Sequence, residues 1–123
     1  VADPPRCGMH PKASKALLEN CYQSGSLIIC DIVYSEMSCF FEVQAELDRA
    51  LETVNIQLVP MDRKASFQGG QLFKKYRTKG GTKNRIMADF LVAAHAVHAA
   101  DALATRDRGF YRSYFPQLKI IEP

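Results

Sequence analysis

The sequence lacks the features that mark membrane, secreted and zinc-binding proteins. Its longest apolar runs fall far short of the about 18 residues of a membrane-spanning helix. The opening residues, V-A-D-P-P-R, contain no apolar segment of the kind found in a signal peptide. None of the four cysteines, Cys7, Cys21, Cys30 and Cys39, forms a C-x-x-C pair, which argues against a zinc knuckle. We therefore expect a cytoplasmic protein with buried, reduced thiols, with disulfides as the minor alternative that an even count leaves open.

Neither the size nor the charge of the chain is extreme. The 123 residues are 47% hydrophobic and 24% charged, which is ordinary for a soluble globular protein. The net charge of +3 permits nucleic-acid binding but does not argue for it. We find no internal repeat and no low-complexity segment. Residues 1–123 are thus predicted to form a single domain, long enough to bury a core of its own.

Short apolar runs alternate with helical patterns along the chain. Asp31 and Asp62 are predicted to cap the helices that follow the first two runs. The first of these helices is expected to continue to Val43, and further helices are expected over 45–54 and 63–77. The predicted strands are Leu27–Cys30, Ile56–Met61, Ala102–Thr105 and Leu118–Ile121. This alternation predicts an α/β fold of three layers, α/β/α, with a central parallel sheet.

Three acidic residues follow predicted strands or begin predicted helices. Glu36 comes shortly after the first apolar run, Asp89 begins a helix, and Asp107 lies just past the run that ends at Thr105. Taken singly, such an acid is usually a helix cap or a turn former. Taken together, the three fall where the carboxyl ends of parallel strands form sites in open α/β sheets. Three carboxylates at one sheet edge repel each other unless a cation lies between them, so we expect a metal site there.

The flanks of these acids resemble the PIN-domain family, specifically VapC-type toxin ribonucleases. The matching pieces are I-V-Y-S-E around Glu36, A-D-F-L-V-A-A-H-A around Asp89 and L-A-T-R-D-R-G-F-Y around Asp107. The closing Y-F-P-Q-L-K-I-I fits the last strand of the family. The order and spacing of the pieces agree over nearly the whole chain, although each piece alone is a weak signal.

The resemblance implies both an activity and partners. Proteins of this type cleave RNA with Mg²⁺ or Mn²⁺ held by acids, and by matching motif Glu36, Asp89 and Asp107 take the acid positions. Thr105 takes a hydroxyl position beside the last acid. Many members are toxins neutralised by a small antitoxin protein. The resemblance also implies a homodimer and an antitoxin peptide that lies near the acids, with an Arg as a bidentate match for carboxylates.

The start of the chain departs from the family pattern. The family begins with a strand that ends in an Asp, and residues Val1 to Met9 offer neither an apolar run nor an acid at its end. We therefore expect an N-terminally incomplete domain whose sheet lacks its first, central strand. A catalytically impaired PIN-like module that binds RNA or a partner is the alternative this departure favours. A receiver-type phosphoacceptor is disfavoured, because L-A-T-R-D offers no lysine after the later strand.

A run of basic residues lies just upstream of Asp89: Lys74, Lys75, Arg77, Lys79, Lys83 and Arg85. Such a run is either a solvated helix face or a track for RNA phosphates. Arg106, Arg108 and Arg112 flank the last acid and are candidates to extend such a track. The nearby aromatics, Tyr76, Phe110, Tyr111 and Tyr114, are expected mainly to pack in the core, with base stacking as the alternative.

Two histidines and an acid, His95, His98 and Asp101, follow at spacings of three. We do not expect a metal site there, because no Cys or Glu completes a zinc set at the usual spacing. At about 100° per residue, His98 lies roughly opposite Asp89 on the helix. Histidines that pack in the core or face a partner are therefore predicted.

Overall fold

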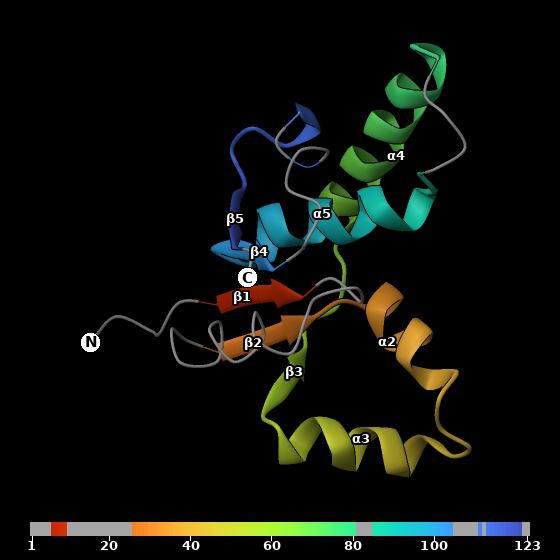
Figure 1. Cartoon of the computed structure of the whole chain (residues 1–123), viewed down its shortest axis with the longest axis vertical. Helices are drawn as coiled ribbons and strands as arrows, with labels where there is room; N and C mark the ends of the chain where they lie inside the picture. Colours follow the sequence, from red (N-terminus) through yellow and green to blue (C-terminus); the bar gives the residue numbers. More distant parts are fainter. Residues whose placement is uncertain (1–5, 10–25, 81–84, 105–110, 112, 122–123) are drawn as a thin grey trace.

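A parallel sheet of five short strands forms the centre of the computed structural model, which describes residues 6–9, 26–80, 85–104, 111 and 113–121. The strands are β1 (Arg6–Met9), β2 (Ser26–Ile29), β3 (Ile56–Leu58), β4 (Ala102–Ala104) and β5 (Lys119–Ile121). They lie in the order β3-β2-β1-β4-β5, all parallel (Figure 1). The order reverses direction at β1, which is the kind of switch point where open α/β sheets place their sites.

Helices connect and cover these strands (Figure 1). Their bounds are α2 (Asp31–Ser38), α3 (Gln44–Thr53), α4 (Arg63–Thr78) and α5 (Met87–Ala99). Helix α5 contacts β1 and β4, α2 contacts β2, α3 contacts β3, and α4 packs along α5. Within the described part of the chain, no helix has both the length and the apolar character needed to cross a bilayer. The predicted α/β fold with a central parallel sheet is confirmed.

The central strand is present, so the expectation of a sheet without its middle strand is wrong. Strand β1 pairs with β2 on one side and with β4 on the other, through Gly8 to Ile28 and Gly8 to Leu103. The sequence R-C-G-M has no apolar run. It can still form a strand, because strand pairing uses backbone groups, which every residue except proline supplies in full. A β-carbon on Gly8 would lie 3.2 Å from the β-carbon of Ala96, so a small residue suits the crossing of α5.

The helix boundaries agree with prediction at α3 and α4 and differ at α2. Helix α2 ends at Ser38, not near Val43, and its N-cap is Cys30, so Asp31 is its first residue and not its cap. Phe40, beyond the end of the helix, is 86% exposed, so the apolar pattern there does not mark a buried face. Asp62 caps α4 as predicted, since its Oδ1 accepts the backbone N–H of Ala65 at 2.8 Å.

Aromatic rings fill the space between α4, α5 and the segment before β5. The ring of Phe90 lies 5.5 Å from those of Phe73 and Tyr76 and 5.6 Å from that of Tyr114, measured between centroids. Tyr76 and Tyr111 are buried. The predicted core role of these two tyrosines is confirmed, whereas Phe110 lies outside the described residues.

Gly69 lets α4 approach α5 closely. A β-carbon there would lie 2.9 Å from Cδ2 of Leu91 and 3.2 Å from the carbonyl oxygen of Phe90. The neighbouring Gly70 has nothing within 4 Å of the same position. Of these two adjacent glycines, only Gly69 is therefore required by packing.

His95 is a buried polar side chain that ties α5 to the link between β3 and α4. It is 3% exposed, and its Nε2 donates to the carbonyl oxygen of Val59 at 2.7 Å. Burial lowers the pKa of His95, while the Val59 hydrogen bond and the nearby carboxylates of Asp31 and Asp62 oppose that shift. The imidazole is therefore held neutral in the folded chain.

The two glycines of α4 provide a matched pair for the α4–α5 contact. We expect Gly70→Ala to raise the free energy of unfolding by up to about 1 kcal/mol, because alanine is the better helix former. Gly69→Ala should instead lower it by about 1–3 kcal/mol, because backbone atoms of α5 cannot yield to the added methyl group. Urea unfolding followed by circular dichroism measures both, and equal effects of the two changes would contradict the close approach.

The neutral His95 predicts an acid-sensitive stability. Below the ordinary pKa of about 6.5, the unfolded chain binds a proton that the folded chain does not, so stability falls as the pH drops. From this one residue the free energy of unfolding should fall by at most about 1.4 kcal/mol per pH unit between about pH 7 and 5. His95→Gln keeps a donor for Val59 without titrating and should flatten that dependence. His98→Gln, the same substitution at an exposed position, is the control for the change of residue type.

Candidate functional site

Two of the three predicted acids lie on elements at the carboxyl edge of the sheet. Helix α2, which carries Glu36, begins directly after β2. Helix α5, which carries Asp89 in its first turn, starts on the same side, beyond the arrowheads of β1 and β2 (Figure 1). The strand–helix order accounts for the place of Glu36, because α2 begins where β2 ends. Helix α5 follows α4 and not a strand, so the place of Asp89 depends on how α5 packs in the fold.

Glu36 is exposed on α2, and the start of that helix is anchored by a buried cysteine. Cys30 is 1% exposed at the N-cap, and burial raises the pKa of its thiol. It is therefore a neutral packing group and not a nucleophile. Cys39, at the other end of α2, is exposed, so the expectation that this thiol is buried is wrong. Its position past the last helical turn explains the exposure, because the apolar side of α2 ends before it.

Asp89 has a structural role in the described part of the chain. Its Oδ2 accepts the backbone N–H of Ile86 at 3.0 Å, which satisfies a donor that the first turn of α5 leaves open. This hydrogen bond holds the carboxylate at the helix start, where the helix dipole favours a negative charge. An ionised carboxylate fixed at this edge is also the donor that a hard divalent cation prefers.

The remaining predicted members, Thr105 and Asp107, lie outside the described residues. Among the residues that are described, no group of three or more His, Cys, Asp or Glu side chains is placed to hold a metal ion. Glu36 and Asp89 fit a divalent cation by their oxygen chemistry and their shared edge. The metal site therefore stays a prediction whose completion depends on Asp107.

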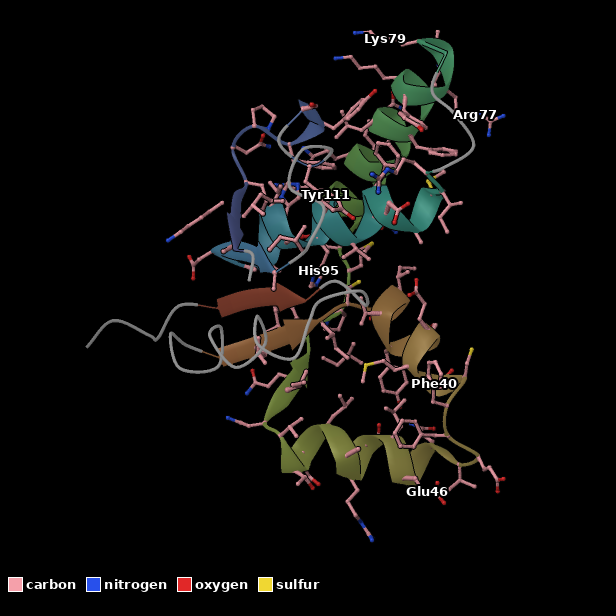
Figure 2. The ribbon with its side chains drawn as sticks, in the orientation of Figure 1. Phe40, Glu46, Arg77, Lys79, His95 and Tyr111 are labelled. Carbon is pink, nitrogen blue, oxygen red and sulfur yellow. The ribbon has the colours of Figure 1, made fainter. Side chains whose placement is uncertain are left out.

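The histidines are used within the fold. His95 is buried on Val59 (Figure 2). Nε2 of His98 lies 2.8 Å from Oε1 of Gln68 on α4. The predicted packing role agrees with the burial of His95, whereas His98 is exposed. Both histidines connect α5 to its neighbours in the fold.

The basic run is exposed at the end of α4. Arg77 and Lys79 reach solvent near the end of the helix (Figure 2), and Lys74 and Lys75 are also exposed. The guanidinium carbon of Arg77 lies 5.7 Å from the ring centre of Phe73. Arg85 is half-buried, and Lys83 lies outside the described residues, as do Arg106, Arg108 and Arg112. Burial of Tyr76 and Tyr111 removes them as platforms for stacked bases.

Sequence reasoning missed a hollow between α2 and α3. It has a volume of about 270 Å³ and is lined by Tyr34, Phe41 and Leu47 among others. The hydroxyl of Tyr34 donates to Oδ1 of Asp48 at 2.6 Å, and this hydrogen bond is the main cause that raises the pKa of the tyrosine. No local pattern signals the contact, because the two residues lie on different helices.

Solved structures with the same fold include bacterial VapBC and Fit complexes. VapBC2 from Rickettsia felis, bound to a DNA fragment from their promoter, has a TM-score of 0.62 at 18% identity over 94% of this chain and 96% of that chain. VapBC-1 from nontypeable Haemophilus influenzae gives 0.69 at 14% identity, covering 95% and 97%. FitAcB from Neisseria gonorrhoeae gives 0.55 at 20% identity, covering 88% and 82%. At such identities these similarities establish a shared fold.

The sequence itself identifies the family. No curated protein sequence gives a significant match. The profile of the PIN domain, however, matches residues 9–116, which is most of the chain. This match begins at the last residue of β1 and includes all three predicted acids. The chain therefore belongs to the PIN-domain family.

Proposed function

We propose that this chain is a metal-dependent endoribonuclease of the VapC type, the toxin of a toxin–antitoxin pair. PIN domains are generally nucleases that use divalent metals. The observation that carries the proposal is the family match over residues 9–116, which includes Glu36, Asp89 and Asp107. RNA phosphodiester bonds are the proposed substrate.

In this proposal Glu36, Asp89 and Asp107 hold Mg²⁺ or Mn²⁺, and Thr105 orients a water or a carboxylate beside them. When bound, such a cation activates water and neutralises charge on the phosphate. Asp89 is fixed by Ile86 before any ligand arrives, so its carboxylate needs little ordering. Glu36 lies on an exposed turn of α2, where substrate and water have access.

The proposed partners are a small antitoxin and a second copy of the chain, in the cytoplasm. Support comes from the shared fold with the VapBC and FitAcB structures. The antitoxin peptide is expected near the acids, where an inserted Arg would pair with carboxylates through two parallel hydrogen bonds.

One observation favours a second candidate, a PIN-like module that binds RNA or a partner without cleaving. Strand β1 has the sequence R-C-G-M and carries no acid at the centre of the sheet. A nuclease site at that edge would then depend on Glu36, Asp89 and Asp107. Turnover by the unaltered chain with Mn²⁺ separates the two candidates directly.

Removal of one carboxylate charge should stop cleavage while the fold is kept. We expect Glu36→Gln, Asp89→Asn and Asp107→Asn each to lower turnover of an RNA substrate at least about tenfold, because a neutral amide binds a hard cation poorly. In the Asp89→Asn variant the new amide oxygen can still accept from the backbone N–H of Ile86, so the start of α5 should persist. Glu46→Gln, an exposed change on α3, is the matched control and should keep full turnover. Turnover that survives all three changes would exclude the metal–carboxylate site.

The proposed partnership predicts a defined assembly. Expressed with the gene next to its own in the source genome, the chain should co-purify with a small protein as a complex that contains two copies of each. Light scattering during size-exclusion chromatography measures its mass. A lone monomer from such an expression would count against the toxin–antitoxin assignment.

A further inference from the structure

Charge is segregated along the middle of the chain. Residues 31–62 contain seven Asp and Glu and a single basic residue, Arg49. Residues 63–80, which form α4 and its C-terminal end, contain six Lys and Arg and no acid. The modest net charge of +3 conceals this separation. Helix α4 is thus strongly basic, whereas the segment before it, residues 31–62, is acidic.

The cations of α4 gather on its solvent side. At about 100° per residue, one face of the helix lies opposite the buried Ala65, Gly69 and Tyr76. We call this the basic face. It consists of Lys64, Phe67, Gln71, Lys74, Lys75 and Thr78, all exposed. Arg63, Arg77 and Lys79 flank it, and the helix is about 24 Å long at about 1.5 Å per residue.

Helix stability does not explain this distribution. Cations in the last turn, such as Lys75 and Arg77, complement the negative end of the helix dipole. Arg63 and Lys64 lie in the first turn, at the positive end, where the dipole disfavours cations. The N-cap Asp62 offsets this in part, because its carboxylate lies at the same end. The positive charge therefore runs the length of the helix against its electrostatic preference at one end.

An exposed aromatic ring lies within the basic face. Phe67 is 70% exposed, although α4 has an apolar side on which to bury a ring. Phosphate-binding cations with an interleaved aromatic ring are the combination that binds single-stranded nucleic acid, because bases stack on the ring while cations follow the backbone.

The end of α4 is close in the chain to the start of α5. Helix α4 ends at Thr78 and α5 begins at Met87, so the two helix ends lie within about 32 Å of each other at the greatest extension of the chain. Asp89 follows in the first turn of α5. The basic face and the helix that carries Asp89 are therefore joined by a short connection.

We propose that the basic face of α4 is the surface that binds the single-stranded RNA substrate, with Lys64, Lys74 and Lys75 on phosphates and Phe67 against a base. This inference rests on the proposed ribonuclease function and names its substrate-binding surface. Glutamine replacements on this face should keep the fold, because the side chains are exposed and glutamine suits a helix nearly as well as lysine.

The test measures binding without cleavage. The full chain is titrated into a fluorescein-labelled single-stranded RNA of about 20 nucleotides, long enough to span one binding site, in EDTA at several salt concentrations, with anisotropy as the signal. Each phosphate contact contributes about 0.7 to the slope of log K against log salt for single strands. Lys74→Gln with Lys75→Gln should therefore reduce that slope by about 1.4 and weaken binding about tenfold at low salt. Lys74→Arg with Lys75→Arg should keep both the salt slope and the affinity of the unaltered chain.

Matched controls distinguish binding at the basic face from the effect of removing any cation or any exposed ring. Arg49→Gln removes a cation from the acidic segment and should leave binding unchanged. Phe67→Ala should weaken binding about fivefold or more, as expected for a stacked base, whereas Phe40→Ala, at a still more exposed ring, should not. Circular dichroism of each variant checks that the helices remain.

The outcomes are distinct from those of the catalytic proposal. An unchanged slope in the Lys74 and Lys75 double variant, or no RNA binding by the unaltered chain, overturns the inference. Binding of poly-glutamate in place of RNA also overturns it, in favour of an acidic protein partner. The RNA-binding surface and the catalytic site can also be separated. If RNA binding depends on the basic face but the acid variants keep their turnover, the binding surface is supported and the catalytic proposal fails.

Discussion

Helix α5 is held between the sheet and α4 by contacts too close for ordinary side chains. Ala93, Ala94 and Ala96 are buried on it, Gly8 of β1 lies beneath Ala96, and Gly69 of α4 meets the backbone at Phe90. Small residues at such crossings shorten the distance between elements and leave no room for repacking. Because the start of α5 carries Asp89, the same close packing fixes an acid at the carboxyl edge of the sheet.

Two polar contacts also hold α5 in place. His95 joins the middle of α5 to the carbonyl of Val59, and Asp89 joins its first turn to Ile86. The first contact is buried and neutral, and the second is a charged group at a helix start. The middle of α5 is thus fixed in the core, and its first turn carries Asp89. The cations of α4 lie on the side of that helix that faces away from α5.

The sequence predicts the elements whose signal is in their side chains. Strands β2 and β4 are apolar on both faces and were recognisable from Leu27 and Leu103 with their neighbours. Strand β1 was not, because its place in the sheet is secured by backbone pairing and by the absence of a side chain at Gly8. The end of α2 was missed because Phe40 continues the apolar pattern although it faces solvent. The Tyr34–Asp48 contact joins two helices and has no local signature.

For the site, the strand–helix order predicts Glu36 after β2, whereas Asp89 lies on a helix that follows α4. Asp107 lies among residues 105–110, outside the described part of the chain, so the convergence of the three acids stays a prediction. The most direct test is an anomalous difference map from crystals of the full chain soaked in Mn²⁺. We predict a peak bounded by the carboxylates of Glu36, Asp89 and Asp107, with Thr105 beside them. Bound Mn²⁺ at another place, or three carboxylates too far apart to share an ion, would contradict the metal–carboxylate site.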